Sequence, residues 1–178
     1  MKKENNPDNS IDRFSNRVEN YVKYRPHYPK EIISFLNNEI GLNPSSLVAD
    51  IGSGPGISAE NFIENGNTVF AIEPNDNMRN AAERIFGKSK NFISVYGTAE
   101  STTLQGNSLD LIISGQAFHW FDKEKCKTEF KRILKPEGYV VLMWNLRVPV
   151  GAFMNEYEKF LIRYGKYYEK LYKDDVDA

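Results

Sequence analysis

The chain has 178 residues, enough for one domain with a buried core and too few for two comfortable ones. Its 23 Lys and Arg nearly balance its 24 Asp and Glu, which argues against a nucleic-acid partner, because such a partner normally requires a basic excess. No apolar run approaches the ~20 residues of a membrane span, the N-terminus lacks an apolar signal core, and one cysteine, Cys126, allows no internal disulfide or multi-cysteine metal site. We therefore expect a cytoplasmic protein with no membrane segment and no metal.

The sequence predicts one domain between two tails. Residues 1–14 are predicted to be a flexible tail, residues 15–172 the domain, and residues 173–178 a second tail. Within the domain, apolar residues at helical spacing predict a first helix over 29–40, which Gly41 can end. From residue 47 onward, strands and helices alternate. Strands are expected over 47–51, 68–73, 91–96, 108–114 and 139–144, and helices over 57–65, 76–86 and 123–134.

The ends of two of these helices carry local signals. Asn75 and Asp122 are predicted N-caps. Lys135 and Pro136 are expected to end the helix that Asp122 begins, and a turn over 136–138 is expected to lead into the fifth strand.

Strands that are apolar along their whole length indicate a parallel sheet covered by helices on both faces. We expect this sheet to be doubly wound, with a ligand site at the carboxyl ends of its strands. Beyond Val150, apolar and aromatic residues recur at three- and four-residue steps from Phe153 to Leu171 and predict a last helix. We interpret it as a helix that covers the core, in preference to one whose apolar stripe binds a partner.

The first predicted strand runs directly into a loop with glycines at 52, 54 and 56. Glycines there let the backbone turn tightly and let a ligand approach without β-carbon collisions. Glu73 ends the next strand, where its carboxylate can accept hydrogen bonds from both hydroxyls of a ribose. Together these features predict a nucleoside site, although Asp50 could instead cap a simple glycine turn. A dinucleotide fingerprint is not met, because Ile57 stands where its third glycine would be.

With these features the chain resembles the class I S-adenosylmethionine-dependent methyltransferases. Within them it is similar to the methyltransferase type 11-like group of small-molecule and trans-aconitate-type enzymes. The resemblance rests on ADIGSGPG at 49–56, AIEPNDNM at 71–78, YGTAE at 96–100, LDLIISGQAFHWFD at 109–122 and LKPEGYVVLMWN at 134–145. It implies a Rossmann-like, doubly wound, mainly parallel sheet. It also implies S-adenosyl-L-methionine as cofactor and S-adenosyl-L-homocysteine as product.

The resemblance implies a cofactor site along the strand ends. Its residues are Asp50, Gly52, Ser53, Gly54, Glu73, Asn75, Met78, Thr98, Ala99, Gly115, Gln116, Tyr21 and Arg25. The glycine loop and Asp50 are implied to hold the methionine part, with Asp50 reaching the cofactor amine through a water. Glu73 is implied to bind the ribose. Gly115 and Gln116 are implied to lie beside the sulfonium.

For several of the other predicted cofactor residues, a second role is possible. Met78 is an apolar wall of the adenine pocket or a core residue. Thr98 stands where many relatives have an aspartate that accepts from the adenine amino group, and Glu100 is a candidate substitute. Tyr21 is implied to cover the methionine moiety and Arg25 to pair with its carboxylate, the alternative being an Arg-Pro turn on the surface.

Four residues are predicted on the acceptor side: His119, Trp120, Asn145 and Arg147. His119 is a candidate general base, needed only if the acceptor is protonated at the working pH, and a packing role is its alternative. Arg25 and Arg147 suit an anionic acceptor, because the guanidinium fork matches a carboxylate. The predicted function is methyl transfer to a small molecule, with a carboxylate as the candidate acceptor. The alternatives are a catalytically inactive or regulatory nucleoside-binding domain and an NAD-dependent oxidoreductase.

The chain departs from the usual pattern of this family at its C-terminal end. Members of this family usually end in two further strands that form an antiparallel hairpin, and nothing after residue 145 predicts a strand. We therefore expect the methyltransferase domain to be C-terminally incomplete. The fifth strand would then be an open sheet edge, which predicts a homodimer through that edge.

Overall fold

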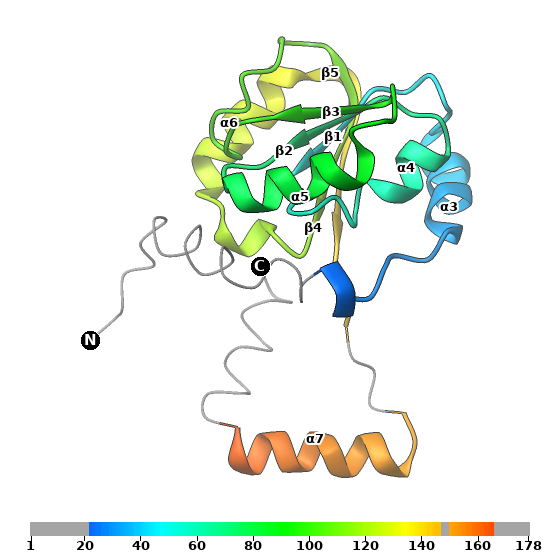
Figure 1. Cartoon of the computed structure of the whole chain (residues 1–178), viewed down its shortest axis with the longest axis vertical. Coiled ribbons are helices and arrows are strands. Elements are labelled where there is room, and N and C mark those ends of the chain that lie inside the picture. Colours follow the sequence, from blue (N-terminus) through cyan, green and yellow to red (C-terminus); the bar gives the residue numbers. More distant parts are fainter. Residues whose placement is uncertain (1–21, 147–149, 166–178) are drawn as a thin grey trace. The chain divides into compact units, whose positions relative to one another are not determined.

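The computed structural model describes residues 22–146 and 150–165 (Figure 1). The chain forms two compact units, residues 1–144 and residues 145–178, each described by itself. Tyr21, Arg147 and both predicted tails lie outside the described residues. None of the described helices is long and apolar enough to cross a membrane.

Unit 1 contains a five-stranded sheet in which every neighbouring pair of strands is parallel. Its strands are β1 (Val48–Ile51), β2 (Val69–Ile72), β3 (Phe92–Val95), β4 (Leu109–Gly115) and β5 (Leu134–Met143). They are arranged in the order β3-β2-β1-β4-β5. The order therefore reverses at β1, and the crevice between the ends of β1 and β4 is where ligands bind in such sheets. The predicted doubly wound α/β fold is confirmed.

Helices cover both faces of this sheet (Figure 1). They are α3 (Glu31–Ile40), α4 (Glu60–Glu64), α5 (Asp76–Phe86) and α6 (Lys123–Ile133). On one face, Leu36 of α3 and Phe62 of α4 pack against Val69 and Ile113 of the strands. Ala82 of α5 packs against Ala71 on that same face, since Ala71 lies two residues after Val69.

The opposite face is covered by α6. Phe130 and Ile133 of this helix pack against Ala49 and Ile112, which lie on the strand face opposite to Val48 and Ile113. Because both faces are covered, the inner strands β1, β2 and β4 are mostly apolar and buried.

The predicted helix caps form as expected. The Asn75 side chain accepts the backbone N–H groups of Asn77 and Met78, at 3.0 and 3.1 Å. Asp122 accepts that of Lys125 at 3.2 Å, at the start of α6. Gly41 ends α3 in the left-handed conformation, with φ of 71°.

Two predicted boundaries are wrong. Helix α4 begins at Glu60 and not at residue 57, because the left-handed glycines of the preceding loop delay the first helical bond, from the Glu60 N–H to the Gly56 carbonyl. Strand β5 begins at Leu134, immediately after α6 ends at Ile133. The sequence instead predicts a helix to residue 134, a turn over 136–138 and a strand that starts at 139. Leu134 pairs with Leu109 and Tyr139 pairs with Leu111, so the intervening residues form an irregularity in the strand.

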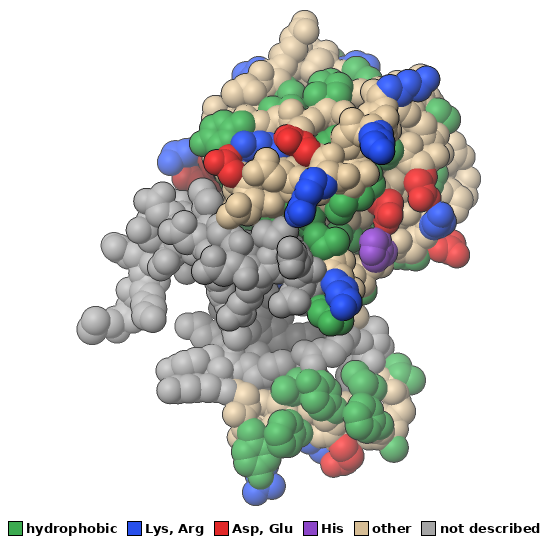
Figure 2. Space-filling model, in the orientation of Figure 1, with side chains coloured by type: hydrophobic (Ala, Val, Ile, Leu, Met, Phe, Trp, Pro, Cys, Tyr) green, Lys and Arg blue, Asp and Glu red, His purple; other side chains and the backbone are tan. Residues whose placement is uncertain are grey.

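Unit 2 contains α7 (Ala152–Tyr164), and no residue of this helix is buried. Figure 2 shows hydrophobic side chains gathered on its visible face, and Phe153, Phe160 and Tyr164 are each more than half exposed. Its predicted role as a covering helix stays a prediction. After β5, the described residues contain no further strand.

Candidate functional site

The loop after β1 contains three glycines with a left-handed backbone, at 52, 54 and 56, and they differ in how closely other atoms pack against them. A β-carbon on Gly52 would lie 2.7 Å from Cβ of Ala117, and one on Gly56 would lie 2.6 Å from the Phe86 ring. These two glycines therefore allow close packing within the protein. A β-carbon on Gly54, whose φ is 54°, would meet no described atom within 4 Å. Gly54 is the glycine at which a ligand can approach the backbone.

Glu73 joins the end of β2 to this loop. Its Oε2 accepts the N–H of Gly54 at 2.9 Å, and its Oε1 accepts the N–H of Asn75 at 2.8 Å. Burial raises the pKa of Glu73, while the two backbone N–H groups and the Arg79 guanidinium oppose the rise. Each carboxylate oxygen has a second acceptor position, so the side chain can hold the loop and still accept from a ligand. This anchoring role is not evident from the sequence, because Gly54 and Glu73 are 19 residues apart.

Asp50, at the end of β1, is fully buried. Its Oδ2 accepts the hydroxyl of Ser58 at 2.6 Å, and its Oδ1 has no hydrogen-bond partner among the described residues. Burial raises the pKa of Asp50 to about 7; the Ser58 bond opposes this, and the Glu73 charge adds to it. Buried carboxylates are normally paired, so this oxygen fits a cationic hydrogen-bond donor of a ligand. In the loop that follows, the Oγ of Ser53 is also buried and has no hydrogen-bond partner among the described residues.

The predicted adenine side lies at the starts of α5 and of the loop after β3. Asn75 is used as the N-cap of α5, and Met78 is buried against Ala81 and Val22. Thr98 and Ser101 exchange two backbone hydrogen bonds, of 3.1 and 3.2 Å, which fold the chain back on itself.

The other residues of that loop are held by neighbouring elements. Ala99 is buried in the core under α6. Glu100 accepts the N–H of Asp122 with Oε1 at 2.9 Å, which holds this side chain at the start of α6 and leaves Oε2 as a further acceptor. Thr102 donates its N–H to Glu129 of α6 at 2.8 Å. The anchor at Glu129 was not predicted, because its partner is 27 residues away.

The end of β4 lies beside the glycine loop. The Ser114 hydroxyl donates to the Ile51 carbonyl at 3.0 Å and ties β4 to β1. A β-carbon on Gly115 would lie 2.8 Å from the Tyr28 hydroxyl oxygen and 3.0 Å from Cβ of Ser58. Gln116 follows with φ of 57° and donates its N–H to Met143 at 2.9 Å.

His119 and Trp120 lie in the short 3-10 helix η1 (Phe118–Trp120), with ring centroids 5.0 Å apart. The contact between Gly52 and Ala117 places this segment against the glycine loop. No group of three or more His, Cys, Asp or Glu side chains in the described part of the chain could hold a metal ion.

Apart from Met78, Thr98, Ala99, His119 and Trp120, whose places are given above, the predicted site residues fall into three sets. The structure brings together the loop and strand-end residues Asp50, Gly52, Ser53, Gly54, Glu73, Asn75, Gly115 and Gln116. Arg25 is exposed, and Asn145 belongs to unit 2. Tyr21 and Arg147 lie outside the described residues.

Comparison with known proteins identifies relatives of this arrangement. An uncharacterized methyltransferase of Schizosaccharomyces pombe is 32% identical over 75% of this chain and 53% of its own length. The malonyl-[acyl-carrier protein] O-methyltransferase of a Marinomonas species is 30% identical over 72% of this chain and 48% of its own. The chain spans between 52% and 59% of the length of the first curated relatives it matches.

A solved structure from Methanococcus maripaludis, assigned to the S-adenosylmethionine-dependent methyltransferases, superimposes with a TM-score of 0.66. It covers 99% of this chain and 80% of its own at 19% identity, so it supports the fold alone. Residues 49–142, more than half of the chain, match the family model described as methyltransferase domain. The chain therefore belongs to the methyltransferase domain family and has the fold of the class I S-adenosylmethionine-dependent methyltransferases.

Proposed function

We propose that this chain binds S-adenosyl-L-methionine at the carboxyl ends of β1, β2 and β4. We propose further that the methyl group of S-adenosyl-L-methionine is transferred to a small-molecule acceptor, which leaves S-adenosyl-L-homocysteine as the product. The observation that carries this proposal is the fully buried Asp50 carboxylate, one oxygen of which lacks a partner among the described residues. Next to it, Gly54 leaves open space at the loop. A cationic amine with a nearby nucleoside satisfies both features.

Individual residues have separate tasks in this proposal. Asp50 accepts from the amine through a water, and Gly54 lets the ligand lie close to the backbone. Glu73 uses its second acceptor positions for the ribose hydroxyls, while Gly54 and Asn75 keep it in place. Met78, Thr98 and Ala99 are proposed to border the adenine, and Arg25 to pair with the carboxylate of the methionine part.

The reaction needs alignment more than proton transfer. When bound, the cofactor supplies an electrophilic methyl group on a positively charged sulfur. The protein contributes a fixed approach direction, exclusion of water and electrostatic stabilisation. Gly115 and Gln116 are proposed to border this position, because the end of β4 adjoins the glycine loop through Ser58.

We propose a carboxylate as the methyl acceptor. A carboxylate is already ionised at neutral pH and needs no base, so His119 would then orient the acceptor together with Trp120, its neighbour in η1. The O-methyltransferase name of the Marinomonas relative supports an oxygen acceptor. An amine or phenol acceptor would instead require His119 as general base.

A regulatory domain that binds the cofactor without turnover is the second candidate. It would use the same cofactor site and would differ from the first candidate only in that no methyl group is transferred. The NAD-dependent alternative loses support, because the chain belongs to a methyltransferase family and Ile57 replaces the third glycine of the dinucleotide fingerprint.

Two measurements test these proposals. Calorimetric titration with S-adenosylmethionine, S-adenosylhomocysteine and NADH is expected to show binding of the first two alone, and no binding of either would overturn the cofactor proposal. Transfer of radiolabelled methyl groups is then measured on a panel of carboxylic acids, with amines and phenols as comparison. Background transfer to every carboxylic acid would overturn the carboxylate proposal, and background transfer to the whole panel would favour the regulatory domain.

A further inference from the structure

Residues 26–30, here called the tether segment, are held against α4 by three side chains of that helix. His27 Nδ1 lies 2.6 Å from Glu60 Oε2, and Lys30 Nζ lies 2.7 Å from Glu64 Oε2. Between them, Asn61 donates from Nδ2 to the Tyr28 and Pro29 carbonyls, at 3.0 and 3.2 Å. Because α4 follows the glycine loop directly, these contacts fix the tether segment relative to the site.

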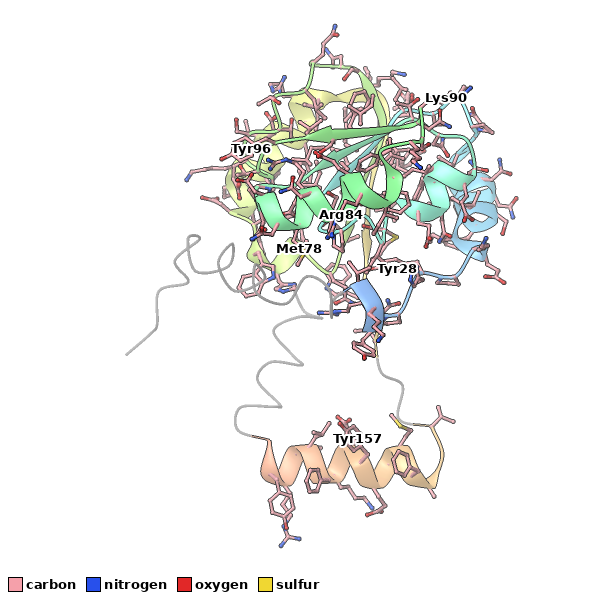
Figure 3. All side chains as sticks on the ribbon, viewed as in Figure 1. Tyr28, Met78, Arg84, Lys90, Tyr96 and Tyr157 are labelled. Carbon is pink, nitrogen blue, oxygen red and sulfur yellow. The ribbon has the colours of Figure 1, made fainter. Side chains whose placement is uncertain are left out.

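The tether segment places Tyr28 at the end of β4 (Figure 3). The hydroxyl oxygen would lie 2.8 Å from a β-carbon on Gly115, so any side chain there would displace it. The hydroxyl donates to the Met143 carbonyl at 3.5 Å, which is at the long limit for a hydrogen bond. The ring is partly buried against the core that α3 and α4 cover.

Tyr28 is also linked to Asp50 through one residue. A β-carbon on Gly115 would meet Ser58 Cβ at 3.0 Å as well as the Tyr28 hydroxyl, and Ser58 Oγ donates to Asp50 at 2.6 Å. The Tyr28 hydroxyl, Ser58 and Asp50 therefore converge at the adjoining ends of β1, β4 and β5. The Tyr28 hydroxyl thus comes from another part of the sequence and joins Ser58 and Asp50, which lie only eight residues apart.

We infer that Tyr28 is a specificity-determining residue that favours the positively charged methyl donor over the neutral product. The inference rests on the proposed function, in which the end of β4 borders the sulfonium. A phenol oxygen presents lone pairs to a cation, and the ring face attracts positive charge as well. Neither interaction favours the uncharged thioether of the product. Tyr28 thus raises affinity for the donor and assists product release.

The test compares the affinities of S-adenosylmethionine and S-adenosylhomocysteine in the whole chain by calorimetry. Tyr28→Phe is expected to weaken binding of the donor by about 3- to 10-fold and to leave binding of the product within about twofold. The matched control is Tyr139→Phe, which removes a hydroxyl from a tyrosine that is 47% exposed on β5. This control is expected to leave both affinities unchanged.

A second variant keeps the inference testable if Tyr28→Phe fails to fold. Gly115→Ala is expected to displace the Tyr28 hydroxyl and to lower the donor-to-product affinity ratio in the same direction. The double variant should add little to either single one, because both remove the same interaction. Equal weakening of both ligands, or an unchanged ratio, would overturn the inference while the cofactor proposal stands. If the wild-type chain binds neither ligand, the proposed function itself fails.

Discussion

Among single residues, Asp50 is expected to make cofactor binding depend on pH. Its pKa is raised to about 7 by burial, so near neutral pH a large fraction of the free protein holds a protonated, uncharged Asp50. A cationic amine binds the ionised form, and binding must then release a proton. We predict that affinity for S-adenosylmethionine rises as the pH increases through about 7, where Asp50 ionises, and falls again at higher pH, where the ligand's own amine loses its proton. Calorimetry in buffers of different ionisation heat measures the proton release directly.

The same group has the opposite effect on the stability of the free protein. Because the folded-state pKa lies above the ordinary value of 3.8, the folded chain holds more protons than the unfolded chain between about pH 4 and pH 7. The contribution of Asp50 to stability therefore falls as the pH rises through this window. Asp50→Asn should remove both this trend and the pH dependence of binding. A pH dependence of binding that persists in Asp50→Asn would contradict the assignment.

Glu73 supports a second prediction at this scale. In Glu73→Gln, one of the N–H groups of Gly54 and Asn75 would face an amide NH₂, which cannot accept it. We expect a loss of about 1–3 kcal/mol in unfolding free energy and a fall of at least roughly tenfold in cofactor affinity. Denaturant unfolding and calorimetry measure the two effects. Glu31→Gln, at an exposed position of α3, is the control and should change neither.

How far single residues could be predicted from sequence depends on the range of their contacts. Asn75 was identified as an N-cap because its two hydrogen bonds reach only to Asn77 and Met78. The positions of Asp50 and Glu73 followed from the ends of two apolar strands. Tyr28 was not found, since its partner Met143 is 115 residues away and only the folded sheet brings the two together.

At the scale of elements, α6 holds the loop after β3 through Glu129. This carboxylate accepts the N–H and hydroxyl of Thr102, and it pairs with Arg132 at 2.7 Å. These contacts lower its pKa to about 2. Its contribution to stability is therefore present above the ordinary pKa of 4.5 and is lost as the pH falls through about 2.

We predict that Glu129→Gln lowers the unfolding free energy by about 1–3 kcal/mol at neutral pH. The difference from wild type should shrink as the pH approaches 2, because the wild-type carboxylate is then protonated too. Chemical unfolding of both proteins across this range measures it. Glu124→Gln, exposed on the same helix, is the control. A difference that stays constant down to low pH would contradict the proposed charge contribution.

Element boundaries were harder to predict than element types. The five strands and the helices α3 to α7 were expected near their observed places, because apolar period and capping residues are local signals, whereas the 3-10 helix η1 was not predicted. The start of α4 depends on the left-handed glycines at 52, 54 and 56, and the sequence does not state their angles. The start of β5 depends on pairing between Leu134 and Leu109, a contact between two elements.

At the scale of the whole molecule, the described sheet has two edge strands that another chain could pair with. Strand β3 forms one edge of the described sheet and β5 the other. On β5, Tyr139 and Val140 are 47% and 43% exposed. Exposed apolar residues on an edge strand favour pairing with another chain, and a charged side chain opposes it.

We propose that β5 mediates a homodimer, and we predict that Val140→Lys shifts this dimer to monomer. Light scattering coupled to size-exclusion chromatography at several protein concentrations measures the mass. The matched control is Ile93→Lys on the opposite edge strand β3, at a position that is 38% exposed, and it should leave the dimer intact. If both variants dissociate equally, the interface is not specific to β5. If the wild-type chain is monomeric at every concentration, the edge does not pair, and the proposal is wrong.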